Sequence, residues 1–241
     1  MTERPLGDFA LHGFTGGPST WLEVAPSATA PWLAGHGPEP WAVCESWSSE
    51  VERLAGLAAA LPAPRRLLGY SLGGRLSLSL LLDHPALFER AVLVGAGFGL
   101  AEPGERELRR EGDAEWCRLL REGGLDAFLV RWEAQPLFAS STSDERAQAS
   151  LRSERRSHAP EGLARSLETV GQAEMPWLEP RLGEVRVPVD WVVGERDEKF
   201  RRLAERAVER MPACRLHVIP GAGHNPLVDA PEAVRRILDP S

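Results

Sequence analysis

The feature that most constrains this chain is the segment Gly69–Arg75, which reads Gly-Tyr-Ser-Leu-Gly-Gly-Arg. It follows an apolar run that ends at Leu68 and precedes a helical pattern from Arg75 to Asp83. A serine with a glycine two residues before it and another two residues after it, between a strand and a helix, is typical of a nucleophile elbow. Side chains do not fit at the glycine positions of so sharp a turn. The segment therefore predicts an α/β fold that exposes the hydroxyl of Ser71 at the end of a strand.

The rest of the chain alternates between strand and helix patterns, which predicts a doubly wound, mostly parallel sheet. Two runs, Arg90–Gly95 and Val187–Gly194, are almost continuously apolar, as expected of strands covered on both faces. Ser48 or Ser49 is the expected N-cap of the first helix. The remaining expected strands span residues 6–11, 30–33, 66–70 and 215–219, and the expected helices span residues 49–61, 75–83, 201–210 and 232–238.

Between residues 100 and 186 this alternation stops, and the segment is rich in charge with helical periodicity. We interpret residues 100–186 as a helical cap that is inserted after the strand at 90–95 and covers the carboxyl ends of the strands. A length of 241 residues suits one large α/β domain, so we expect residues 1–241 to form a single domain.

Composition limits the classes of function. The net charge of −7 argues against general nucleic-acid binding, and no apolar run is long enough for a membrane span. The first residues lack the apolar segment of a secretory signal, and the three cysteines are scattered, so we expect reduced thiols in a cytoplasmic protein. Lys199 is the single lysine among 28 basic residues, so an individual arginine is informative only where a motif selects it.

The candidate catalytic residues are Ser71, Asp197 and His224. A serine hydroxyl becomes reactive when a histidine accepts its proton and a carboxylate orients that histidine. Asp197 and His224 each follow an expected strand, and the order Ser, Asp, His is that of α/β-hydrolase enzymes. Each has a structural alternative, because Asp197 could cap a helix and His224 could bind backbone groups. Their joint occurrence at three strand ends favours a catalytic triad.

An oxyanion hole is expected from two backbone N–H groups, those of Phe14 and Leu72. Phe14 lies in the His-Gly-Phe loop after the first strand, where His12 is expected to fix the loop. The other histidines have no motif support and are expected at the surface or in turns: His36, His84, His158 and His217.

Taken together, the motifs resemble the α/β-hydrolase superfamily over nearly the whole chain. More narrowly, they resemble the 2-succinyl-6-hydroxy-2,4-cyclohexadiene-1-carboxylate synthases (MenH) of menaquinone biosynthesis. Arg75 stands four residues after the serine, and Lys199 and Phe200 stand two and three residues after Asp197. The cap carries Trp-Glu-Ala-Gln-Pro-Leu-Phe at 132–138 and then Leu-Arg at 151–152. The chain departs from the family in lacking an N-terminal hairpin, so the sheet is expected to be shortened at that edge.

The resemblance implies a lyase that eliminates pyruvate from a cyclohexene bearing several carboxylates. Arg75 and Arg152 match binding positions of the family, and a third arginine early in the cap is expected to be Arg110 or Arg109. The alternative for Arg152 is a position on a solvated helix face. Tyr70 and Trp132 are expected to line the pocket.

Two other functions stay open at this point. One is a carboxylesterase or C–C hydrolase that uses Ser71 as a covalent nucleophile, and the other is a catalytically silent binding module on the same fold. No phosphate-binding glycine loop and no metal-ligand spacing occurs, so neither a cofactor nor a metal is expected. The expected partner is a small polycarboxylate, and the expected assembly is a monomer or weak homodimer.

Overall fold

The computed structural model describes residues 7–138 and 145–239 of the chain. In this part of the chain, five parallel strands form one sheet whose spatial order follows the sequence. All four strand pairs are parallel, so the sheet presents all its carboxyl ends at one edge. The strands are β1 (Gly7–Leu11), β2 (Arg65–Tyr70), β3 (Arg90–Val94), β4 (Val189–Gly194) and β5 (Cys214–Ile219).

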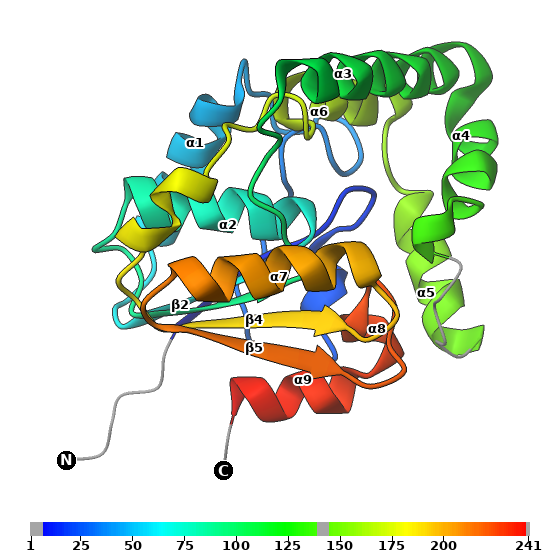
Figure 1. Ribbon diagram of the computed structural model, residues 1–241. Coiled ribbons are helices and arrows are strands. Elements are labelled where there is room, and N and C mark those ends of the chain that lie inside the picture. Colours follow the sequence, from blue (N-terminus) through cyan, green and yellow to red (C-terminus); the bar gives the residue numbers. More distant parts are fainter. Residues whose placement is uncertain (1–6, 139–144, 240–241) are drawn as a thin grey trace.

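Helices cover both faces of the sheet, as the apolar strand patterns predicted (Figure 1). Alternate strand residues point to opposite faces, so Leu67, Leu93 and Trp191 join one apolar cluster, and Leu68 and Val192 join the other. The first cluster packs under α1 (Trp47–Ala59), α2 (Leu72–Asp83) and α7 (Glu198–Arg210), and the second packs against α9 (Pro231–Leu238).

A helical cap region follows β3 and precedes β4. In Figure 1, α3 and α6 lie above α2, and α4 and α5 lie beside the carboxyl ends of the strands. The cap has an apolar centre of its own, in which Phe128 and Leu163 are fully buried. Its helices are α3 (Pro103–Arg118), α4 (Gly124–Glu133), α5 (Glu145–Arg155) and α6 (Pro160–Val170), with a π-helical turn at Leu119–Gly123 and a 3₁₀ turn at Pro136–Phe138.

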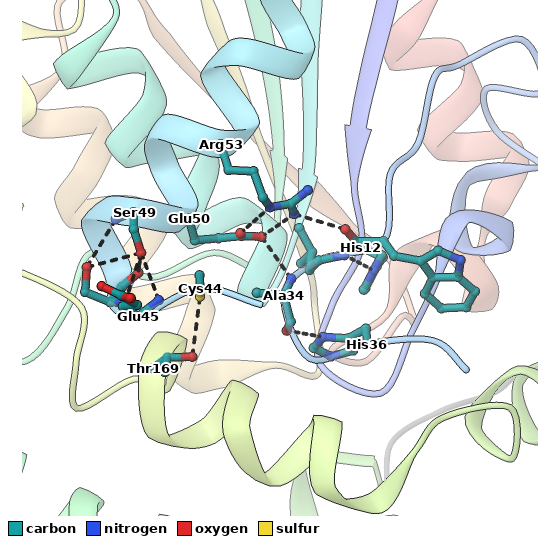
Figure 2. Close-up of polar contacts among 12 residues, drawn as sticks. His12, Ala34, His36, Cys44, Glu45, Ser49, Glu50, Arg53 and Thr169 are labelled. Carbon is teal, nitrogen blue, oxygen red and sulfur yellow. Dashed lines mark hydrogen bonds and ion pairs between the residues drawn. The ribbon is translucent and has the colours of Figure 1, made fainter. Parts of the chain in front are cut away.

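The strand expected at residues 30–33 is wrong, because only Thr29 pairs with β1, in a single bridge to Phe9. The backbone donors of this segment bind side chains in place of a strand. The N–H of Leu33 donates to His12 Nε2 at 3.1 Å, and the N–H of Ala34 donates to the buried carboxylate of Glu50 at 2.9 Å (Figure 2). The segment is therefore a loop that is fixed from β1 and α1.

Two smaller expectations are also corrected. The N-cap of α1 is Ser46, and neither Ser48 nor Ser49, because Ser46 Oγ accepts the N–H of Ser49 at 3.2 Å. His36 and His158, expected at the surface or in turns, are buried, with exposed fractions of 1% and 4%. Both rings bind backbone groups of loops that are distant in sequence.

Candidate active site

Ser71 lies between the end of β2 and the start of α2, in a backbone conformation that L-residues rarely adopt, with φ 51° and ψ −106°. The glycines on either side of it are sterically required. A Cβ atom on Gly69 would lie 2.3 Å from Ser77 Oγ, and a Cβ atom on Gly73 would lie 2.3 Å from the carbonyl oxygen of Leu11. The close approach of these segments enforces the turn, and the turn holds the serine at the strand end.

The structure brings Ser71, His224 and Asp197 together from three loops at the carboxyl edge of the sheet. His224 Nε2 lies 3.1 Å from Ser71 Oγ, and His224 Nδ1 lies 2.6 Å from Asp197 Oδ2. Since a carboxylate can only accept, Nδ1 carries the proton, and Nε2 is free to accept the proton of the serine hydroxyl. This arrangement can remove a proton from Ser71 or from a molecule bound beside it.

Asp197 both orients His224 and caps the N-terminus of α7. One carboxylate oxygen orients His224, and the other accepts the N–H of Phe200 at 3.5 Å as the N-cap of α7. The ring of Phe200 then packs against that of His224, with centroids 4.4 Å apart. The start of α7 therefore fixes the carboxylate and supports the histidine ring at the same time.

The two N–H groups expected to form the oxyanion hole are those of Phe14 and Leu72. The N–H of Gly73 donates to the carbonyl of His12 at 2.9 Å, which joins the elbow to the loop that carries Phe14. Within the described residues, neither the N–H of Phe14 nor that of Leu72 donates to another protein group. Both residues line the same cavity as Ser71. The pair can therefore bind an oxygen that gains negative charge, as an oxyanion hole does.

These groups open into a cavity of about 470 Å³ between the sheet edge and the cap. The size suits a small molecule of the usual ligand class. Tyr70 and Trp132, both expected to line a pocket, lie in its wall. Burial raises the pKa of Tyr70, so its hydroxyl stays protonated and can donate. Other aromatic and polar residues of the wall are Phe138, Phe200, Gln135, Ser166 and Gln172.

Three cationic side chains also line the cavity: Arg75, Arg109 and Lys199. Arg75 stacks over the ring of Trp47 at 5.7 Å, and its Nη1 is fully buried with no hydrogen-bond partner among the described residues. Burial, with a further contribution from Arg109, lowers the pKa of Arg75 to about 9. Even so, the group is charged at neutral pH. A buried donor without a partner is costly, and a bound anion would satisfy it.

The family model described as "Alpha/beta hydrolase family" matches residues 9–237. The chain belongs to the alpha/beta hydrolase family.

Individual members of the alpha/beta hydrolase family are similar to this chain in sequence or in structure. The 2-succinyl-6-hydroxy-2,4-cyclohexadiene-1-carboxylate synthase of Enterobacter sp. (strain 638) is 32% identical over 95% of this chain and 88% of its own. The solved structure of MenH from S. aureus superimposes with a TM-score of 0.89 at 25% identity, covering 98% of this chain and 93% of that one. A thermophilic esterase from Thermogutta terrifontis shares the fold, with a TM-score of 0.76 at 22% identity and coverage of 98% and 89%.

Arg110 and Arg152, two of the arginines expected to bind substrate, do not line the cavity. Arg110 points away from the cavity and pairs with Glu107 and Glu174 at the surface. Arg109 is the member of the pair that lines the cavity. The two residues differ by about 100° around α3, so the docking of that helix decides between them.

The expectation for Arg152 is corrected in the same way, because its side chain is exposed and does not line the cavity. Arg155, one turn later on α5, faces inward. It pairs with Glu133 at 2.8 Å, lies over the ring of Phe138, and borders a smaller cavity of about 240 Å³ that also touches His224.

Lys199 and Phe200, which belong to the motif shared with the family, both lie in the cavity wall. The useful signal was the position of the single lysine of the chain. Among the described residues, no cluster of His, Cys, Asp or Glu side chains is placed to hold a metal ion. No helix in residues 7–138 or 145–239 combines the length and apolar character needed to cross a membrane.

Proposed function

We propose that this protein is a lyase that eliminates pyruvate from 2-succinyl-5-enolpyruvyl-6-hydroxy-3-cyclohexene-1-carboxylate, a step of menaquinone biosynthesis. Relatives with 32% identity carry the name of that synthase. In this proposal, Ser71, His224 and Asp197 perform proton transfer, and residues 100–186 act as the cap over the substrate.

The observation that carries the proposal is the Arg75 guanidinium in the same cavity as Ser71. Its Nη1 is buried without a partner in the described structure, and it lies beside a second cation, Arg109. A guanidinium binds a carboxylate through two parallel hydrogen bonds, which fixes the orientation of the substrate. Arg109 is paired with Asp113 at 2.8 Å, whereas Arg75 forms no ion pair with a described residue. A substrate carboxylate would give Arg75 a charged partner, and a neutral ester would not.

The chemistry follows from the proton positions at the triad. His224 Nε2 accepts the hydroxyl proton of Ser71, and the serine oxygen removes the proton α to the succinyl ketone. Negative charge then develops on the ketone oxygen, where the N–H groups of Phe14 and Leu72 can stabilise it. Re-formation of the ketone makes a new C2=C3 bond, shifts the ring double bond from C3=C4 to C4=C5 and breaks the C5–O bond. The enolpyruvyl group leaves as the enolate of pyruvate, which takes up a proton at its methylene carbon to give pyruvate. No covalent bond to Ser71 is needed.

Pyruvate release tests this proposal, with the unstable substrate generated in situ by the preceding enzyme of the pathway. We compare the wild type with Ser71→Ala, Arg75→Gln and the surface control Arg110→Gln. We expect Ser71→Ala to lower kcat by about 10³-fold or more, and Arg75→Gln to lower kcat/KM by about 100-fold. Arg110→Gln should match the wild type. Release no faster than the uncatalysed background in the wild type would refute the lyase.

Ester or C–C hydrolysis with Ser71 as the covalent nucleophile is the second candidate. The 3.1 Å contact between His224 Nε2 and Ser71 Oγ, with free backbone donors beside it, suits acyl transfer equally well. Turnover of simple neutral esters that persists in Arg75→Gln, without pyruvate release, would establish this candidate over the lyase.

A further inference from the structure

The backbone next to the expected oxyanion hole is held in a strained conformation. Thr15, which follows Phe14, is buried and has a φ of 64°. Such a conformation persists where the surroundings enforce it. The N–H of Thr15 donates to His36 Nε2 at 3.3 Å, and its carbonyl oxygen lies 3.1 Å from His158 Nε2. Two histidines thus bind the N–H and the carbonyl of Thr15, and their rings contact each other edge to face with centroids 5.5 Å apart.

His158 reaches this loop from the cap, at the junction between α5 and α6. Its Nδ1 accepts the N–H of Gly37 at 2.9 Å, so the ring proton is on Nε2 and is donated to Thr15. The next residue, Ala159, donates its N–H to the carbonyl of Gly37 at 3.1 Å. One buried ring therefore joins the cap to two loops of the sheet domain.

The loop at residues 32–37 is itself anchored from α1, which gives His158 a fixed support. Glu50 is fully buried and accepts the N–H of Ala34, and Arg53 pairs with Glu50 and donates to the carbonyl of Trp32 at 3.1 Å. Figure 2 shows Glu50 between Arg53 and Ala34, with His36 on the same loop.

A second cap residue contacts the same region one helical turn before His158. Glu154 Oε1 accepts both the N–H of Ser19 at 3.1 Å and its hydroxyl at 2.5 Å. A Cβ atom on Gly17 would lie 2.6 Å from that same carboxylate oxygen, so the cap packs directly on this loop.

We propose that His158 is a positioning residue for the oxyanion hole. It acts through Thr15: the hydrogen bond from its Nε2–H holds the Thr15 carbonyl, in the peptide between Thr15 and Gly16. The strained backbone of Thr15 transmits this constraint to Phe14, and so to the direction of the Phe14 N–H relative to Ser71. The cap thereby contributes to proton transfer without contacting the reacting atoms. This role rests on the proposed use of Phe14 and Ser71 in the reaction.

Substitution of His158 by glutamine or asparagine can retain one of its two hydrogen bonds and remove the other. The amide nitrogen of glutamine can occupy the place of histidine Nε2, and the amide oxygen of asparagine can occupy that of Nδ1. His158→Gln therefore keeps the donor to Thr15, His158→Asn keeps the acceptor for Gly37, and His158→Ala keeps neither. His84→Gln is the matched control, because His84 lies at the opposite end of α2 from Ser71.

Two rates are measured for each variant: kcat for pyruvate release, and the rate of Ser71 labelling by a fluorophosphonate, whose phosphonyl oxygen also needs the oxyanion donors. We expect His158→Ala and His158→Asn to lower both rates by about tenfold or more, with KM changed less than about twofold. His158→Gln should stay within about threefold of the wild type, like the control. Melting temperatures, measured in parallel, identify any variant that is unfolded at the assay temperature.

The labelling rate allows the positioning role of His158 to be tested independently of the proposed lyase activity. If the wild type releases no pyruvate while labelling still follows the order Gln above Asn and Ala, the positioning role stands and the lyase fails. If both rates are unchanged in a folded His158→Ala or His158→Asn, or if His158→Asn retains them and His158→Gln loses them, the positioning role is refuted.

Discussion

Acidification from pH 7 to pH 5 is expected to destabilise the fold through His12, His36 and His158. Each ring accepts a backbone N–H at one nitrogen and donates to a carbonyl at the other, so a second proton would break an existing hydrogen bond. Burial is the main cause that lowers the pKa of all three, that of His12 to about 3 and that of His36 well below its usual value.

The sign of the effect follows from proton linkage. Because the pKa of these histidines is lower in the folded state, the unfolded chain binds more protons below pH 6.5. Their contribution is therefore fully present above pH 6.5 and is lost as the pH falls. For His12 and His36, whose pKa values lie far below the usual one, each group changes the free energy of unfolding by about 1.4 kcal/mol per pH unit in that window, or about 2 kcal/mol between pH 7 and 5. His12 and His36 together give about 4 kcal/mol, and His158 adds to this loss.

Urea unfolding followed by circular dichroism at pH 7, 6 and 5 measures this dependence. His36→Gln removes one titrating group, so it should lose about 2 kcal/mol less than the wild type between pH 7 and 5, whatever its stability at pH 7. Val51→Ala, a buried truncation in α1, is the control that lowers stability without changing titration, so its curve should run parallel to that of the wild type. A wild-type free energy that changes by less than about 1 kcal/mol would refute the reasoning.

Two further predictions concern the cavity and the elbow. Arg109→Gln should raise KM for the polycarboxylate by about tenfold, because it removes a cation from the cavity wall, while Arg110→Gln should not; equal effects in steady-state kinetics would contradict the cavity assignment. Gly73→Ala should abolish activity and lower the melting temperature, because its Cβ would lie 2.3 Å from the carbonyl oxygen of Leu11. Gly56→Ala, at a helix position with no atom within 4 Å of the added Cβ, should stabilise by about 1 kcal/mol, and a Gly73→Ala protein that behaves likewise would exclude the steric explanation.

Local patterns predict the five strands of the sheet, with one additional strand at 30–33 that is wrong, and they place Ser71, Asp197 and His224 after strands. Gly69 is required by contacts with the turn and the following helix, and Gly73 by the close approach of β1 at Leu11. Both requirements fall on fixed positions around Ser71, so the glycine spacing is visible in sequence. Asp197 and His224 follow apolar strands of the same parallel sheet, and parallel strands present their carboxyl ends at one edge. Strand periodicity and chain order therefore bring these side chains to one place, before any detail of packing is known.

Tertiary structure alone decided which cap arginines face the cavity and which histidines are buried. Arg109 and Arg110 have the same chemistry and are adjacent in sequence, and only the packing of α3 on α6 turns one inward. His36 and His158 interact with backbone groups of Thr15 and Gly37, at separations of up to 143 residues. Such bonds depend on where loops meet, which leaves no periodic signal in the chain. The sequence by itself determined the reactive edge of the sheet, and the contact between cap and loops determined how that edge is lined and held.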